Sequence, residues 1–321
     1  NILYRPRSWV LAESTQATPA VLGPPLSSEP EVFTAEYRVF RDGRDSNGDP
    51  LSAGMVERGC GLRDPADDAT IQPVMTQVFL PANDMLHAFR GGPCYGGSCS
   101  LDEEGKELWG FVPYDLLPAL RERFVQEPQG REDHVYMLAR GVRYADVFFP
   151  KAVTDTEWCG AGDGTGLEGI WRRVVFIGRG PGGKFLSALD VTAPGDLQTA
   201  ADQAPGPVPL WSRGNPDQAE ATRERPGATD NHNASDTSAY AYMGETWSLP
   251  VVALVDSQNG NYSASPRDPN RKVTHALFTG SGYGNDTACF TGGICEGTTF
   301  YTLDALTGDV ITTADVGQRA A

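Results

Sequence analysis

The chain has 321 residues, and 26 basic against 42 acidic side chains give a formal net charge of −16. A pI near 4.6 disfavours a nucleic-acid-binding protein, because phosphate recognition needs a basic face. No apolar run approaches the roughly 18 residues that a membrane-spanning helix needs. The 37 glycines and 24 prolines exceed ordinary usage but fall short of low-complexity levels, so they indicate many tight turns.

In chain order, the sequence predicts a series of short strands. Short apolar runs, rich in Val, Ile, Phe and Tyr and bounded by Gly, Pro, Asn or Asp, have the composition of strands. These runs are Val74–Leu80, Val135–Leu138, Val174–Gly178, Phe185–Leu189, Val251–Val255, His275–Thr279 and Thr298–Leu303. The pattern predicts an all-β protein.

One segment, Tyr114–Phe124, carries a helical stripe. Asp115 is placed to cap its start, and Pro118 is tolerated only in a first turn, so we expect one short helix. The apolar residues of the stripe share one helical face and are Leu116, Leu117, Leu120 and Phe124.

Two polar stretches, near residues 43–68 and 195–233, interrupt the strand signals. Strand patterns resume on both sides of each, which is typical of surface insertions rather than of linkers. We therefore expect residues 1–321 to be part of a single domain.

A hairpin unit recurs along the chain: a strand, an Asp-containing turn that ends in Gly, and a second strand with Trp or Ile. Such turns supply the backbone angles that hairpins need, and their repetition at long, irregular spacing favours a β-propeller over a sandwich. The copies are Asn83–Phe89 (partial), Asp102–Trp109, Leu186–Trp211 and Phe300–Ile311.

Four of the six cysteines form two close, glycine-rich pairs, Cys94 with Cys99 and Cys289 with Cys295. The spacing favours a local disulfide in each loop over a zinc site, because the four histidines are scattered singly. Disulfides imply an oxidising compartment. The remaining two, Cys60 and Cys159, are left as a further candidate pair.

The order of several motifs resembles the C-terminal propeller of the PilY/PilC family, the tip-associated proteins of bacterial type IV pili. Its hairpins also resemble those of quinoprotein-type propellers. The resemblance spans Ser14 to Ile311, and the motifs that carry it are Ser14–Pro25, Tyr37–Phe40, Val78–Phe89, Gly105–Pro113, Trp171–Thr192, Glu245–Pro250 and Gly280–Gly284.

The resemblance implies a non-enzymatic adhesin or assembly factor at the tip of a type IV pilus. It would bind a surface or host ligand and dock on minor pilins, after export through the periplasm to the cell surface. The resemblance implies no catalytic residue and no bound cofactor, apart from a calcium ion that family members often carry.

The sequence matches the calcium-binding loop of the family only in part. Its nearest match offers Asp45, Asn47 and Asp49, with Pro50 at the place of the glycine and Ala53 at the place of the last acid. Calcium takes six to eight oxygens, so these three side chains are a candidate site, but a polar hairpin tip is the favoured interpretation.

Three enzymatic or nucleotide-binding alternatives find less support. Gly178–Phe185 matches a dinucleotide-binding glycine pattern but leads into a strand rather than a helix, so a hairpin turn is expected. No hydrolase nucleophile elbow occurs, and His87 is expected to be a hydrogen-bonded histidine that anchors a strand. A quinone-dependent dehydrogenase remains the alternative function, although the adjacent cysteine pair of those enzymes is missing.

The repeat count predicts an incomplete ring. Met85–Trp109, Lys184–Trp211, Trp247–Thr279 and Thr298–Ile311 give at most about four blades, whereas closed propellers use up to eight. We expect a blade face left bare by this chain to be covered by further residues of the same protein or by another chain.

Overall fold

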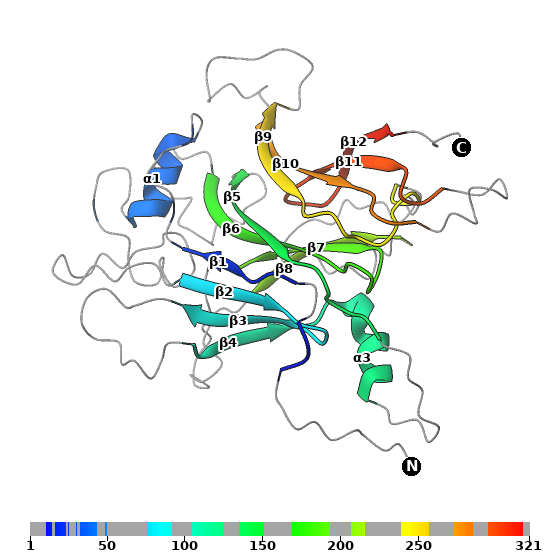
Figure 1. The fold of residues 1–321 in the computed structure, drawn as a ribbon. Helices are drawn as coiled ribbons and strands as arrows, with labels where there is room; N and C mark the ends of the chain where they lie inside the picture. Colours follow the sequence, from blue (N-terminus) through cyan, green and yellow to red (C-terminus); the bar gives the residue numbers. More distant parts are fainter. Residues whose placement is uncertain are drawn as a thin grey trace, which may run out of the picture.

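The structure, a computed structural model, describes most of the strands, helices and turns discussed below. The described residues are 11–14, 17–23, 25, 30, 33–43, 49, 76–91, 105–124, 135–150, 169–192, 207–215, 239–256, 273–284 and 295–316. They form three four-stranded antiparallel sheets and two short helical segments (Figure 1).

Each sheet is a simple meander, in which every strand pairs with the next strand of the chain. The first sheet contains β1 (Ala20–Leu22), β2 (Thr76–Pro81), β3 (Leu86–Gly91) and β4 (Glu107–Phe111). The second contains β5 (Val142–Pro150), β6 (Gly169–Gly178), β7 (Phe185–Asp190) and β8 (Val208–Gly214). The third contains β9 (Val251–Asp256), β10 (Val273–Gly280), β11 (Thr299–Asp304) and β12 (Val310–Asp315). A four-stranded meander is the unit of a β-propeller blade.

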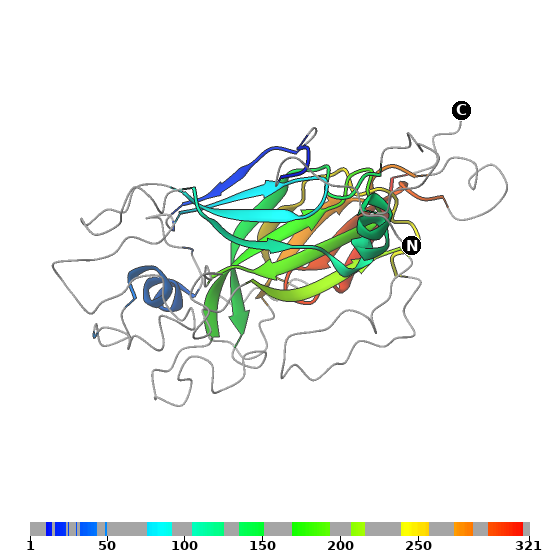
Figure 2. The same ribbon diagram turned by 90° about the horizontal axis from the view of Figure 1, so that it is seen from below.

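The three sheets pack face to face in chain order, with the second between the other two (Figure 1 and Figure 2). One core cluster joins the first and second sheets and includes Phe79, Trp109, Val175 and Leu189. A second core cluster joins the second and third sheets and includes Trp211 and Leu303. This stacking confirms the predicted all-β propeller fold.

The internal repeat is visible in the pairing of the third and fourth strands. The register shifts once in each sheet, after Ala88, Ala188 and Thr302 respectively. Asp304 shapes the β11–β12 turn, because its Oδ1 accepts the backbone N–H of Leu306 at 2.8 Å. Gly308 closes that turn with a φ of 73°.

Two of the four predicted repeats lie in one blade, so the described residues stay within the predicted limit of about four blades. The segments predicted as two separate repeats, Trp247–Thr279 and Thr298–Ile311, belong to one blade, because β10 pairs with β11 from Ala276 to Gly280. The described residues therefore make three blades.

The predicted helix exists as a 3-10 turn, η2 (Tyr114–Leu116), followed by α3 (Leu117–Phe124). Two details of the prediction are wrong. Leu117 is 52% exposed instead of buried with the stripe, because consecutive residues of a helix point in directions about 100–120° apart and Leu116 is the one that faces the core. Asp115 does not cap the helix; it binds the buried guanidinium of Arg179 with Oδ1–Nη2 at 2.6 Å.

Several strand boundaries also differ from the predictions. Val135–Leu138 is a bend rather than a strand, and its Met137 N–H donates to the Asn83 side chain at 2.7 Å. Strand β8 is the Trp211 strand expected in the hairpin copy Leu186–Trp211, and it lies inside the stretch near 195–233 that was predicted as an insertion. Residues 193–206 and 216–238 lie outside the described part. The helix α1 (Thr34–Asp42) was not predicted; it packs beside β6 at the opposite end of the strands from α3 (Figure 1 and Figure 2).

The outer face of the third sheet exposes apolar side chains. Val251 and Phe300 are 55% and 40% exposed, and no strand of the described residues covers this face. That additional residues or another chain cover it stays a prediction. Within the described residues, no helix has the length and apolar character to cross a membrane.

Candidate functional site

A pocket of about 740 Å³ opens at the ends of the strands of the third sheet. Here β9 and β11 begin and β10 and β12 end, so the antiparallel order brings four chain segments together. We call it the edge pocket; its lining residues are Glu245, Trp247, Ser248, Gly280, Ser281, Gly282, Tyr283, Gly297, Thr299, Phe300 and Val316.

The wall of the edge pocket is held by a backbone bridge between two loops. Glu245 N donates to Tyr283 O at 2.7 Å, and Tyr283 N donates back to Glu245 O at 2.9 Å. Gly282 lies beside this bridge with a φ of 83°, and a Cβ there would stand 1.7 Å from Glu245 O. Only glycine fits both the backbone angle and the close approach.

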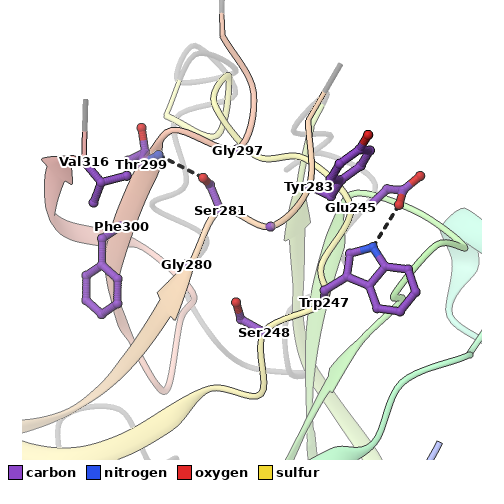
Figure 3. A pocket seen from close by; sticks show the side chains of 11 residues that line it. Glu245, Trp247, Ser248, Gly280, Ser281, Tyr283, Gly297, Thr299, Phe300 and Val316 are labelled. Carbon is purple, nitrogen blue, oxygen red and sulfur yellow. Dashed lines mark hydrogen bonds between the residues drawn. The ribbon is translucent and has the colours of Figure 1, made fainter. Parts of the chain in front are cut away.

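The two sides of the edge pocket differ in chemistry (Figure 3). Phe300 and Val316 form an apolar side, whereas Trp247, Glu245 and Tyr283 form a side with aromatic rings and a carboxylate. The Trp247 Nε1–H donates to Glu245 Oε2 at 2.9 Å, which fixes the indole beside the acid.

The floor of the edge pocket consists of small residues whose polar groups are partly engaged. Ser281 Oγ accepts the backbone N–H of Thr299 at 2.9 Å. The glycines at positions 280, 282 and 297 leave the rings of the two sides accessible. An open, mainly apolar cavity with a few fixed polar groups is typical of a binding site.

A second polar cluster lies in the first sheet. His87, in β3, is 2% exposed; its Nδ1 lies 2.6 Å from Glu107 Oε1 and its Nε2 3.3 Å from Asp84 Oδ1. Burial alone would lower the pKa of His87, but the hydrogen bonds and charges of the two carboxylates raise it above 6.5 overall. The prediction that His87 anchors a blade strand is confirmed.

A second histidine has the opposite electrostatics. His275, in β10, accepts the backbone N–H of Phe148 at its Nδ1, at 3.2 Å, and its ring packs edge-on against Trp171. Burial lowers its pKa from 6.5 to about 4, so the ring is neutral at pH 7.

The two predicted site residues that the structure describes, Asp49 and Cys295, do not line the edge pocket. Of the candidate calcium ligands, Asp45 and Asn47 lie outside the described residues and Asp49 is exposed. Among the described side chains, no group of three His, Cys, Asp or Glu is arranged to hold a metal ion.

Of the cysteines in the predicted disulfides, the structure describes one, Cys295. Cys295 is disulfide-bonded and buried, two residues before Gly297 of the edge pocket. Its predicted partner Cys289 lies outside the described residues, as do Cys94, Cys99, Cys60 and Cys159. The pairing of Cys289 with Cys295, and that of Cys94 with Cys99, stays a prediction.

Sequence reasoning did not identify the edge pocket, although it singled out both of its main loops as motifs. Glu245–Pro250 precedes β9 and Gly280–Gly284 follows β10. Since the two strands of an antiparallel hairpin start and end at the same edge, the strand pattern between these motifs was the signal that places them together.

The chain has recognisable relatives, although no protein-family model matches it. It is 24% identical over 285 residues, 88% of its length, to the type IV pilus biogenesis factor PilY1 of Pseudomonas aeruginosa. It is 30% and 31% identical, over 36% and 39% of its length, to two type IV pilus biogenesis factor PilY1 homologs of Xylella fastidiosa. The chain spans only 6% to 16% of the length of these relatives.

A solved structure, the C-terminal domain of Pseudomonas aeruginosa PilY1, is also similar. The TM-score is 0.39 and the identity 21%, over 77% of this chain and 31% of that one. The sequence similarity to PilY1 extends over 88% of the chain, and it agrees with the order of motifs that resembles the PilY/PilC family.

Proposed function

We propose that this chain is part of a type IV pilus biogenesis factor that acts by binding rather than by catalysis. The observation that carries the proposal is the similarity to PilY1 over 88% of the chain. The three rigid blades and the loops at their edges suit this role, since a β scaffold can hold divergent loops in fixed positions for recognition.

The finer part of the proposal concerns place and partners. The protein would lie at the pilus tip on the cell surface, dock on minor pilins, and present its loops to a surface or host ligand. An oxidising export route agrees with the disulfide at Cys295.

The experiment is a capture assay with purified minor pilins of the same bacterium, paired with a gene deletion. We expect the tagged chain to retain at least one minor pilin, and the deletion strain to lose surface pili. Normal piliation of the deletion strain together with no captured pilin would contradict the proposal. Reduction of a dye by the chain after addition of pyrroloquinoline quinone and calcium would favour a dehydrogenase instead.

A further inference from the structure

The edge pocket has an electrostatic asymmetry that limits what it can hold. Its lining contains one formally charged side chain, Glu245, and neither lysine nor arginine. Next to the lining, Asp315 precedes Val316, and the nearby Lys184 is engaged by Glu296, with Nζ–Oε1 at 2.5 Å. An anionic ligand would therefore meet carboxylates without a free cation in the lining.

Several hydrogen-bond donors of the lining are already used. The Trp247 indole N–H donates to Glu245, the Thr299 N–H donates to Ser281, and the N–H groups of Glu245 and Tyr283 are paired with each other's carbonyls. The lining still offers a ligand a carboxylate, hydroxyl groups and aromatic faces. Aromatic faces and carboxylates both attract cations.

The opposite side of the edge pocket is apolar and accessible. Phe300 and Val316 are 40% and 64% exposed, and they lie on the opposite side of the glycine-lined floor from Trp247 (Figure 3). A ligand that fits both sides has an apolar stem and a cationic end. Lysine and arginine side chains have this form.

We propose that the edge pocket binds the side chain of a lysine or arginine of a protein partner. The aliphatic stem lies along Phe300 and Val316, and the cationic head lies at Glu245 beside the rings of Trp247 and Tyr283. The volume of about 740 Å³ leaves room for flanking peptide backbone, which favours a protein segment over an isolated headgroup such as choline. The inference deepens the proposed function, on which it rests for the choice of a protein as partner.

The test uses the purified chain and short fluorescent Gly/Ser peptides with a central lysine, arginine or norleucine. Norleucine keeps the aliphatic stem and removes the charge. In fluorescence anisotropy we expect the norleucine peptide to bind about tenfold more weakly than the basic ones, which corresponds to about 1.4 kcal/mol. Choline chloride is titrated as a competitor.

Two variants test the two sides separately. Glu245→Gln removes the charge while its amide oxygen can still accept the Trp247 N–H, and Val316→Lys adds a repelling charge at an exposed position. Glu245→Gln should weaken the basic peptides about tenfold and leave the norleucine peptide unchanged. Val316→Lys should also weaken the norleucine peptide, because the aliphatic stem loses its contact with Val316, and it should weaken the basic peptides more. Glu122→Gln, the same change at an exposed position of α3, is the matched control and should bind like the parent.

The outcomes separate this inference from the proposed function. Equal binding of the norleucine and lysine peptides, or unchanged binding by both variants, would overturn the inference, as would tighter binding of choline than of the peptides. Captured minor pilins without any binding of basic peptides would refute the edge-pocket assignment and leave the pilus role standing. Peptide binding with no captured pilin would do the reverse.

Discussion

The close approach of Gly282 to the backbone of Glu245 gives the sharpest test of the edge pocket. We expect Gly282→Ala to destabilise the chain much more than Gly105→Ala. Both glycines have positive φ angles, 83° and 77°, so alanine meets the same left-handed backbone strain at each. A Cβ at Gly105 meets no atom within 4 Å, whereas one at Gly282 would stand 1.7 Å from Glu245 O.

The magnitudes follow from this difference. Left-handed strain alone costs about 1 kcal/mol, and this is the whole effect expected for Gly105→Ala. Relief of the contact at Gly282 moves the Glu245 carbonyl by more than 1 Å, which breaks the paired backbone hydrogen bonds with Tyr283. Two such bonds contribute about 1–3 kcal/mol, so Gly282→Ala should cost about 2–4 kcal/mol.

The assay is urea unfolding of the two variants and the parent, followed by circular dichroism. The parent slope must be retained, so that changes in midpoint report stability rather than compactness. Equal losses for the two variants would show that the Glu245–Tyr283 bridge does not constrain position 282, and the described wall of the edge pocket would then be wrong.

Three further predictions concern charge and covalent structure. The folded-state pKa of His87 lies above 6.5, so the protonated ring stabilises the fold fully below pH 6.5, and this stabilisation is lost as the pH rises through the folded-state pKa. In urea unfolding, the difference in stability between the parent and His87→Gln should therefore be larger at pH 6 than at pH 8. Arg179→Met should cost about 3 kcal/mol, because it leaves the Asp115 carboxylate, whose side chain is only 10% exposed, without its guanidinium. Adding Asp115→Leu should recover part of that loss, and a double variant as unstable as the single one would contradict this account. Peptide mapping without reduction should recover Cys289 and Cys295 in one disulfide-linked species, and a link from Cys295 to any other cysteine would refute the local pairing.

Local patterns predicted the strands that the core requires. Six of the seven expected runs overlap strands, because each combines β-branched or aromatic residues with flanking turn residues. Val135–Leu138 has the same composition but forms a bend, since tertiary contacts such as the Met137 hydrogen bond to Asn83 fix its backbone. Composition does not record such a contact between residues far apart in sequence.

The blade count and the site were harder to predict for a related reason. A hairpin joins two strands that are close in sequence. The pairing of β10 with β11, which places two predicted hairpins in one blade, joins strands on either side of a long connection. Nothing in the residue pattern distinguishes that connection from one between two blades. Likewise Asp115 has the sequence position of a helix cap. Its partner Arg179 lies in another blade, and the buried guanidinium decides where the carboxylate points.

The register of the third blade changes the meaning of the repeat. In the first two blades a tryptophan of the fourth strand pairs with an alanine of the third: Trp109 with Ala88 and Trp211 with Ala188. Both indoles are 3% exposed. In the third blade the position that matches them is Thr312, paired with Thr302, and not Ile311 as the sequence repeat indicated.

The tryptophan position serves the contact between blades rather than the hairpin itself. The Trp211 Nε1–H donates to Ala305 O, in the turn of the next blade, at 3.0 Å. A Cβ at Gly308 of that turn would stand 2.7 Å from the Trp211 ring, so this glycine also makes room for the neighbouring indole. Thr312 is exposed and has no ring to reach across. Any segment that covers the third blade must therefore be anchored by other groups, such as the exposed Val251.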